Sequence, residues 1–399
     1  MKAEIVAIGN EVLSGSIVNT NAAFISSILT QEGYPVVYHA VFPDNIDEIV
    51  KGLKIALERS DIIIVSGGLG PTLDDVTKEA VAKVFNIPLA YREYIAAKIR
   101  EKTQKEEVIK QQALLPIDAK IMPNIIGTAV GMYWQKGNKI IAVFPGVPYE
   151  LKEMFLHYFL PILKKQCPAK KTIHEKWLSF CLLSEMEIND FLKDNKEISF
   201  GLYPSLRGVK LHILAQNQLA LEKCIKLLQE KFSKNLFSLD GATIEEVIHK
   251  EFILKKKSLA LAESCSGGAL CRSLVLLPGA SKFLLGSVVS YSNDLKENIL
   301  HVSKNVLEKQ GAVSKETVEA MAYGLFTLTS CDYAVAISGI AGPDGGSIEK
   351  PVGTVWIAVG SKNNIKAHKF NFHAERKTII EYSSSCALGL LWQAIHFSS

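Results

Sequence analysis

Short apolar runs rich in Ile and Val alternate with longer mixed segments over the first 160 residues. We expect strands at 3–8, 34–41, 61–66 and 139–144, and helices at 19–32, 45–59, 75–86 and 149–160. Apolar strands that alternate with helices predict a parallel sheet covered on both faces. The Lys/Glu-rich segment 91–113 predicts an exposed helical excursion from this sheet.

A second and a third pattern follow the segment KKQCPAKKT (164–172), which we interpret as a linker. A small α+β module is expected next, with strands at 173–181, 198–204 and 208–215 and helices at 184–193 and 217–233. The remainder again predicts α/β structure, with strands at 258–262, 284–291, 332–338, 352–359 and 366–372 and helices at 243–254 and 375–396. The sequence therefore predicts three domains, at 1–165, 172–238 and 242–399.

The amino-acid composition argues against nucleic-acid and membrane partners. With 48% hydrophobic and 22% charged residues and a net charge of +4, the chain is typical of a soluble globular protein. No basic stripe and no apolar run of about 20 residues is present, so we expect neither nucleic acid nor a membrane as partner. The seven cysteines form no CxxC pair, and MKAEIVAIG reads as a strand rather than a signal peptide, so we expect reduced thiols and a cytoplasmic location.

The first candidate site is the segment IVSGGLGPTLDDVTKEA (63–79), which predicts a strand, a glycine turn and a helix start. Its glycines allow close approach of a phosphate, and its acids favour a divalent cation beside that phosphate. The loop AIGNEVLSG (7–15) adds another acid at the same expected sheet edge, where open α/β sheets bind ligands. The candidate residues are Gly67, Gly68, Gly70, Asp74, Asp75 and Glu11. The alternative is that Asp74, Asp75 and Thr77 only cap the helix.

The second candidate site is LALAESCSGGAL (259–270), a predicted buried strand followed by two serines and a diglycine at a helix start. Ser264 or Ser266 can act as a nucleophile, Lys296 as its base if its pKa is lowered, and Tyr291 as a proton relay. The N–H groups of Gly267 and Gly268 can hold an oxyanion or a phosphate. A third loop adds Ser338, Gly339, Gly342, Gly345 and Gly346.

Each of these residues also has a structural interpretation. The serines can cap the helix, Lys296 can be a solvated surface lysine, Tyr291 can belong to the core, and Cys265 is expected to be buried and unreactive. The joint occurrence of these residues at predicted strand ends favours an amide or phosphate site for a small molecule.

Residues 1–165 resemble the molybdopterin-binding fold, a three-layer α/β domain, and more closely the N-terminal domain of the CinA (competence/damage-inducible) family. The motifs QQALLP (111–116), PNIIGTAVG (123–131) and FPGVP (144–148) carry this resemblance. It implies a metal-dependent ADP-ribose pyrophosphatase, with a divalent cation such as Mg²⁺ held by Asp75, Glu11 and Asp44.

Residues 243–397 resemble the CinA C-terminal domain, the nicotinamide mononucleotide deamidase family. The resemblance rests on AESCSGG, VVSYSNDLK, GAVS (311–314) and SGIAGPDGGSIEKPVGTVW. It implies hydrolysis of nicotinamide mononucleotide to nicotinic acid mononucleotide and ammonia in pyridine nucleotide salvage. Ser264 is then the nucleophile, Lys296 its base and Tyr291 an assistant, with Ser266 as the reserve nucleophile and Arg376 matching a family arginine. The resemblance implies no cofactor for this step and a homodimer.

Two other functions remain open at this point. A nucleotide-sensing or scaffold protein would bind a nucleotide without turnover and would keep its function after Ser264→Ala. Pterin binding by the N-terminal domain rests on fold analogy alone.

Overall fold

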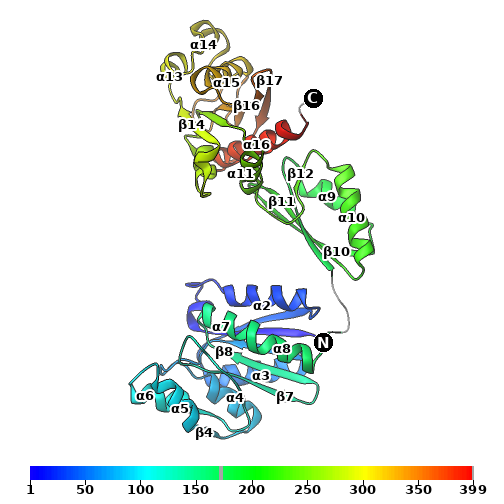
Figure 1. The fold of residues 1–399 in the computed structure, drawn as a ribbon, viewed down its shortest axis with the longest axis vertical. Coiled ribbons are helices and arrows are strands. Elements are labelled where there is room, and N and C mark those ends of the chain that lie inside the picture. Colours follow the sequence, from blue (N-terminus) through cyan, green and yellow to red (C-terminus); the bar gives the residue numbers. More distant parts are fainter. Residues whose placement is uncertain (170–173, 398–399) are drawn as a thin grey trace. The chain divides into compact units, whose positions relative to one another are not determined.

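A computed structural model describes residues 1–169 and 174–397, and its contacts divide the chain into two compact units, 1–173 and 174–399 (Figure 1). The predicted linker at 164–172 lies in part outside the described residues, and its first residues end helix α8 (Leu160–Gln166). Within the described part of the chain, no helix combines the length and the apolar character that crossing a bilayer requires.

The first unit is built on a six-stranded sheet with the order β2-β1-β3-β8-β7-β6. Its strands are β1 (Ala3–Ile8), β2 (Val36–Phe42), β3 (Ile62–Ser66), β6 (Lys120–Met122), β7 (Gly131–Lys136) and β8 (Lys139–Phe144). Strands β2, β1, β3 and β8 are parallel, as expected. Strands β7 and β6 were not predicted; β7 is antiparallel to β8 and to β6. The two-residue turn between β7 and β8 reverses the chain, because a connection that short can join only antiparallel strands.

Helices cover both faces of this sheet, which makes three layers. Val6, Ile63 and Val65 face a core shared with α3 and α4, whereas Ile5 and Ile64 face a core shared with α2 and α7. The helices are α1 (Asn10–Leu13), α2 (Thr20–Gln31), α3 (Ile46–Arg59), α4 (Thr77–Phe85), α5 (Glu93–Arg100), α6 (Glu106–Ala113), α7 (Pro148–Met154), the π-helical η1 (Phe155–Phe159) and α8.

The excursion at 91–113 is helical, as predicted, but it is not wholly exposed. Its two helices, α5 and α6, bury Ile95, Ile99 and Ile109 in the same core as α3 and α4. A two-stranded ribbon of β4 (Leu89–Tyr91) and β5 (Leu114–Pro116) closes the base of the excursion. The excursion therefore forms one wall of the first unit.

The second unit contains two sheets. Residues 174–238, the middle module, form the antiparallel sheet β10-β11-β9-β12 with two helices. Its elements are β9 (His174–Phe180), α9 (Glu185–Leu192), β10 (Ile198–Ser205), β11 (Gly208–Ala215), α10 (Gln218–Lys231) and β12 (Leu236–Ser238). Strand β12 was not predicted; the other elements lie where the sequence pattern placed them.

Residues 241–397, the C-terminal module, form the five-stranded sheet β14-β13-β15-β16-β17. Ala260 and Ala262 face a core with α15, while Leu259 and Leu261 face a core with α11, α12 and α16. The elements are α11 (Ile244–Lys255), β13 (Leu259–Glu263), α12 (Ala269–Val275), η2 (Ala280–Lys282), β14 (Leu284–Val289), α13 (Asn293–Asn298), α14 (Lys304–Gln310), α15 (Lys315–Thr329), β15 (Tyr333–Gly339), β16 (Thr354–Ser361), β17 (Asn364–Asn371) and α16 (Arg376–Phe397). Strands β14, β13 and β15 are parallel, so their carboxyl ends meet at one edge.

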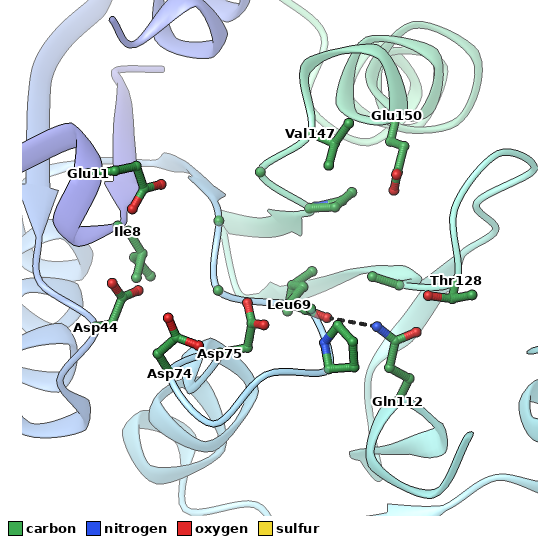
Figure 2. A pocket seen from close by; sticks show the side chains of 18 residues that line it. Ile8, Glu11, Asp44, Leu69, Asp74, Asp75, Gln112, Thr128, Val147 and Glu150 are labelled. Atoms are coloured by element: carbon green, nitrogen blue, oxygen red, sulfur yellow. Dashed lines mark hydrogen bonds between the residues drawn. The ribbon is translucent and has the colours of Figure 1, made fainter. Parts of the chain in front are cut away.

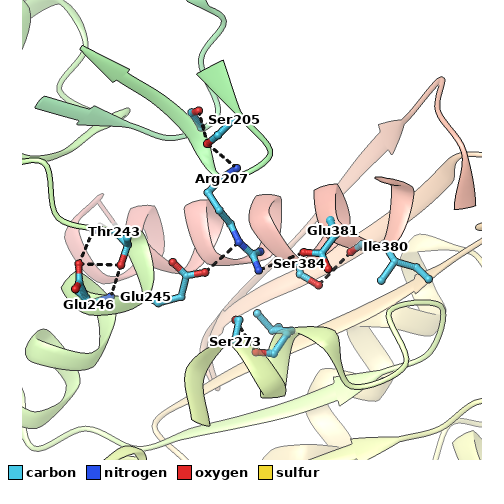
Figure 3. Close-up of polar contacts among 11 residues, drawn as sticks. Ser205, Arg207, Thr243, Glu245, Glu246, Ser273, Ile380, Glu381 and Ser384 are labelled. Atoms are coloured by element: carbon cyan, nitrogen blue, oxygen red, sulfur yellow. Dashed lines mark hydrogen bonds and ion pairs between the residues drawn. The ribbon is translucent and has the colours of Figure 1, made fainter. Parts of the chain in front are cut away.

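Arg207, in the turn between β10 and β11, joins the middle module to the C-terminal module. Its guanidinium forms ion pairs with Glu245 of α11, at 3.1 Å, and with Glu381 of α16, at 3.3 Å (Figure 3). The side chain of Leu182 packs near Gly389 of α16, where an added Cβ would lie 2.8 Å from it. These contacts explain why the two modules form one compact unit.

Candidate functional sites

The predicted serine–lysine pair of the C-terminal module is in place. Lys296 of α13 points its Nζ at Ser264 Oγ, 3.0 Å away, and also donates to the backbone oxygen of Ser290 at 2.7 Å. Ser264 follows β13 and Ser290 follows β14, two adjacent parallel strands, so the sheet edge brings them together. The structure thus joins residues that are 32 positions apart in the sequence.

Lys296 is a buried lysine, not the solvated surface residue of the alternative interpretation. Only 1% of it is exposed, and none of its hydrogen bonds goes to a carboxylate. Burial without a counter-charge disfavours the ammonium form and lowers the pKa of Lys296. The Ser290 carbonyl holds one N–H of the amine, so that in the neutral form the lone pair can face Ser264.

The buried carboxylate of Glu263 fixes residues 264–268, which join β13 to α12 and are called the serine loop below. Glu263, the last residue of β13, is fully buried, and its carboxylate accepts the backbone N–H groups of Gly268, Leu270 and Cys271 at 2.9–3.1 Å. The Ser287 hydroxyl donates to the same carboxylate at 3.2 Å. Donors of this kind stabilise a buried anion, and the anion in turn fixes the loop that carries Ser264.

The prediction that the N–H groups of Gly267 and Gly268 hold an oxyanion or a phosphate is not supported by their hydrogen bonds. The N–H of Gly268 is bound to Glu263, and the N–H of Gly267 donates to Ser264 O at 3.1 Å. Both groups therefore have internal partners, and the structure does not offer them to an oxyanion. The physical reason is that the chain supplies its own anion at the start of α12.

The third loop lies against the serine loop. A Cβ added at Gly339 would lie 3.0 Å from the sulfur of Cys265, so the end of β15 and the serine loop are close neighbours. Ser338 is buried and donates to Ala312 O at 2.7 Å, which ties the loop to the GAVS segment. The later glycines pack within their own loop, since added Cβ atoms at Gly342 and Gly346 would press on Val352 and at Gly345 would meet Ile340.

Arg376 links the segment after β14, which carries Tyr291, to the loop after β15, which carries Gly342. One nitrogen of its guanidinium donates to Gly342 O at 2.6 Å and the other donates to the Tyr291 hydroxyl at 2.9 Å. Tyr291 is 60% exposed, so it is not a core residue, and its hydroxyl is bound to Arg376 rather than to Lys296. The structure therefore places Tyr291 and Arg376 together at the outer rim of the site.

Three further groups surround the pair. The hydroxyls of Ser266 and Ser290 are buried and have no hydrogen-bond partner within residues 1–169 and 174–397. Burial raises the pKa of the Cys265 thiol to about 12, which keeps it protonated and unreactive, as predicted. A polar substrate could form hydrogen bonds with these two unpaired hydroxyls of Ser266 and Ser290.

The predicted glycine loops of the first unit line one open pocket of about 350 Å³ (Figure 2). The pocket lies at the carboxyl ends of β1, β3 and β8, where the sequence pattern placed it. Gly67, Gly68 and Gly70 line it. Gly67 has a φ of +106°, and a Cβ there would collide with the backbone oxygen of Ile8, so only glycine fits this turn.

The capping interpretation of the aspartates is wrong. Helix α4 begins at Thr77 after Val76, and no side chain caps it. The carboxylate of Asp75 instead accepts the N–H and the hydroxyl of Thr72, which fixes the turn before the helix, and Thr77 donates to Gly67 O at 2.9 Å. Asp74 and Asp75 both line the pocket.

The predicted metal ligands share this pocket but do not form a compact cluster. Glu11, Asp44 and Asp75 all line it, yet among residues 1–169 and 174–397 no three His, Cys, Asp or Glu side chains lie close enough to hold an ion together. Burial raises the pKa of Asp44, and the nearby charges of Glu11, Asp74 and Asp75 raise it further, against the Asn10 N–H. Such carboxylates fit an ion like Mg²⁺, which protein sites usually hold through one or two carboxylates plus substrate phosphates and water.

The sequence analysis missed residues on the opposite side of this pocket. Figure 2 shows Gln112, Thr128 and Glu150 across from the four carboxylates. Gln112 lies within QQALLP and Thr128 within PNIIGTAVG, so both motifs carried a signal, but polar side chains far from any strand end suggested no shared site. Glu263 and Ser290 were also missed, although each is adjacent to a residue that was singled out.

Comparison with protein families gives two matches. The family described as "CinA C-terminal domain" matches residues 241–395, and the family described as "Probable molybdopterin binding domain" matches residues 4–165. The two matches cover the two candidate sites separately.

Curated relatives match over nearly the whole chain. A "CinA-like protein" of Thermosipho melanesiensis is 38% identical over 98% of this chain and 98% of its own length. A "CinA-like protein" of Thermotoga maritima is 38% identical over 97% of this chain and 96% of its own. Among solved structures, the protein CinA from Thermoplasma acidophilum is 38% identical, with a TM-score of 0.38, over 41% of this chain and 96% of that one.

Proposed function

Since the chain belongs to the CinA family, we propose that its C-terminal module hydrolyses the carboxamide of nicotinamide mononucleotide, giving nicotinic acid mononucleotide and ammonia. The observation that supports this proposal best is the buried Lys296 amine, 3.0 Å from the Ser264 hydroxyl and without a carboxylate partner. An amine of lowered pKa beside a hydroxyl is the arrangement that activates a serine nucleophile.

The reaction follows from this arrangement in two halves. Neutral Lys296 takes the proton of Ser264 as Oγ attacks the carboxamide carbon, which forms a C–O bond and a tetrahedral oxyanion. The C–N bond then breaks, the proton passes from Lys296 to the leaving nitrogen, and ammonia departs from an acyl-enzyme. Water attacks the acyl carbon, Lys296 takes its proton, and Ser264 leaves protonated as the carboxylic acid is released.

The oxyanion needs donors other than the diglycine amides. The hydroxyls of Ser266 and Ser290 are the buried, unpaired polar groups nearest to the pair in the sequence, and each has a proton to donate. Arg376 at the rim supplies a cation for the phosphate of the mononucleotide, and the Tyr291 hydroxyl that it holds can contact the same substrate.

Ammonia release from nicotinamide mononucleotide, measured in the presence of EDTA, tests this proposal. Wild type should turn over, and Ser264→Ala and Lys296→Ala should not, while circular dichroism confirms that both variants are folded. If turnover persists in Ser264→Ala, Ser264 is not the nucleophile and Ser266 becomes the candidate. A folded wild type without turnover would contradict the deamidase and favour a nucleotide sensor.

We also propose a second activity, hydrolysis of the diphosphate of ADP-ribose in the first unit. The acidic lining of one pocket supports it, since Glu11, Asp74 and Asp75 lie there with Asp44 and their charges add to burial in raising the pKa of Asp44. A divalent cation, when bound, would polarise the diphosphate, with Asp75 and Asp44 or Glu11 as its holders. The glycine loops would seat the phosphates by close backbone approach.

Release of AMP from ADP-ribose with and without Mg²⁺ tests the second activity. Wild type should need the cation, and Asp75→Asn should be at least about 10-fold slower because one cation ligand and the turn at Thr72 are both weakened. Cleavage at the same rate in EDTA would contradict the metal-dependent mechanism.

A further inference from the structure

A cavity of about 220 Å³ in the second unit shares no lining residue with the serine–lysine site. It is formed by β16, β17, the last turns of α16 and the turn after α10, so it lies where the middle module meets the C-terminal module. The two modules are joined beside this cavity by Gln393 of α16, whose side chain donates to the backbone oxygen of Lys234 at 2.6 Å. A ligand in the cavity would therefore contact both modules.

Three basic side chains line this cavity, and none of the described residues that line it is acidic. Lys366 and His368 lie two positions apart on β17 and so on the same face of that strand, and Lys234 comes from the turn after α10. Within the part of the chain that the structure describes, none of these three side chains has a hydrogen bond or an ion pair. Lys257 of the same module, in contrast, pairs with Asp332 at 2.9 Å. The cavity thus collects basic groups that lack a counter-charge.

The imidazole of His368 shows the effect of this missing counter-charge. Burial lowers the pKa of His368, and the positive charge of Lys366 lowers it further. Neither α16 nor β16 adds a titratable side chain to the lining, so only the two lysines act on the imidazole from within the cavity. An anion between these groups would favour the imidazolium form and would form charge-assisted hydrogen bonds with the ammonium groups.

The rest of the lining is mostly apolar. Val359 of β16 and Leu390 of α16 are buried, and Phe397 lines the cavity but remains 38% exposed. Asn364 and Gln393 add two amides. An inorganic ion would leave this apolar surface uncovered, whereas an organic anion would bury part of it. Because ligand sites for drug-sized molecules measure roughly 300–1,000 Å³, this smaller cavity suits a compact ligand rather than a dinucleotide.

We infer that this cavity is a binding site for a small phosphomonoester with a compact apolar body. The phosphate lies among Lys234, Lys366 and His368, and the organic part lies against Leu390 and Phe397. Two ammonium groups balance the two charges of a phosphomonoester, whereas a carboxylate would balance only one of them. The bound ligand connects the middle module to the C-terminal module. This site depends on neither of the two proposed hydrolytic activities.

An NMR titration of the full chain, labelled with ¹³C in its histidines, tests the inference at the cavity itself. The signal of His368 is identified by its loss in His368→Gln. The probes are phenyl phosphate, inorganic phosphate, benzoate and phenol. Phenyl phosphate should shift the His368 signal saturably and raise the pKa of His368, because the anion favours the imidazolium. Inorganic phosphate and benzoate should each bind at least about threefold more weakly than phenyl phosphate, and phenol should leave the signal unchanged.

Two lysines of β17 provide a matched pair of variants. Lys366→Met removes one of the two ammonium groups of the cavity and should weaken the binding of phenyl phosphate about tenfold, equivalent to about 1.4 kcal/mol. Lys369→Met removes the same charge three positions further along the strand, on its opposite face, and should bind phenyl phosphate like wild type. Both lysines are exposed, so both variants should fold, which circular dichroism checks.

Three results would overturn the inference. If the His368 signal does not respond to phenyl phosphate, the cavity does not bind this ligand. If Lys366→Met and Lys369→Met weaken binding equally, the anion is attracted by the net charge of the surface and not by the cavity. If inorganic phosphate or benzoate binds as tightly as phenyl phosphate, the cavity does not select a phosphomonoester with an apolar body.

Discussion

The two candidate sites differ in how their charges are balanced. At the C-terminal site every buried charge of the serine loop has internal partners, since Glu263 accepts three backbone N–H groups and a hydroxyl. At the glycine-loop pocket of the first unit five carboxylates line one cavity, and burial together with the nearby charges of Glu11, Asp74 and Asp75 raises the pKa of Asp44. The first arrangement is complete in the folded chain, whereas the second would be stabilised by the cation and the anionic ligand proposed for it.

This difference decides what each site can do by itself. A serine–lysine pair needs only a proton transfer between its own two side chains, and the fold has already desolvated the base. The proposed diphosphate hydrolysis in the first unit would instead depend on a divalent cation that the carboxylates of the pocket hold together with substrate phosphates. The same fold principle, loops at the carboxyl ends of parallel strands, therefore underlies both a serine–lysine pair that is already aligned and a carboxylate-lined pocket for which we propose a cation.

The largest expected effect is a complete separation of the two activities. Ser264→Ala should lower ammonia release by at least about 10³-fold and leave ADP-ribose cleavage unchanged. Asp75→Asn should slow ADP-ribose cleavage at least about 10-fold and leave ammonia release unchanged, since the two residues belong to different compact units. Both rates, measured on the same two purified variants, check this, and a loss of both activities in either variant would contradict independent sites.

The next effect concerns pH and the charge of Lys296. Its lowered pKa means that the neutral amine is populated at lower pH than for an ordinary lysine of pKa 10.5, so kcat/KM should rise with pH and level off above the lowered pKa. Lys296→Arg, which stays protonated, should be inactive at every pH of the profile.

The free energy of unfolding should depend on the same protonation of Lys296 and should also rise with pH. Between the lowered pKa and 10.5 the unfolded chain binds more protons than the folded chain, so the free energy of unfolding of wild type should rise with pH there. Lys296→Met should lose this rise and be at least as stable as wild type near neutral pH, because it buries no amine. Urea unfolding at several pH values measures this, with Lys304→Met, at an exposed lysine, as the control.

A smaller effect is expected at the carboxylate below the serine loop. Glu263→Gln keeps the shape but replaces an acceptor oxygen by an NH₂ group that faces N–H donors, and should cost about 1.5–3 kcal/mol of the free energy of unfolding. The kcat for ammonia release should also fall, since the loop that carries Ser264 loses its support. Glu316→Gln, at an exposed acid of α15, should change neither quantity.

The smallest effect should come from the glycine-loop pocket without its cation. In EDTA, Asp44→Asn should leave stability within about 0.5 kcal/mol of wild type or raise it slightly, because a repelled charge is removed. In excess MgCl₂ the wild type should gain stability by mass action, and the variant should gain less. Thermal unfolding under both conditions decides between these outcomes, and equal gains would remove Asp44 from the cation site.

Much of the fold was readable from local patterns. Strands β1, β8 and β11 and helices α3 and α10 lie within a residue or two of their predicted positions, because their apolar spacing is regular and they are long enough to be distinctive. The missed strands β4, β5, β6 and β12 are three residues each, too short for a period to show. The six-residue strand β7 was also not predicted, and its antiparallel pairing with β8 depends on the connection between them rather than on the strand itself.

Some features of the candidate sites, like some elements of the fold, could be predicted from local motifs, and others could not. The sequence by itself determined which loops line the two candidate sites, since Ser264, Gly67, Gly68 and Asp75 stand in motifs whose backbone demands are local. Only the tertiary structure decided that Lys296 is buried against Ser264, that Glu263 rather than a substrate occupies the start of α12, and that Gln112 and Thr128 face the carboxylates of the first unit. Those facts depend on which strand ends become neighbours and on what they exclude from water, and both are properties of long-range packing that no local pattern encodes.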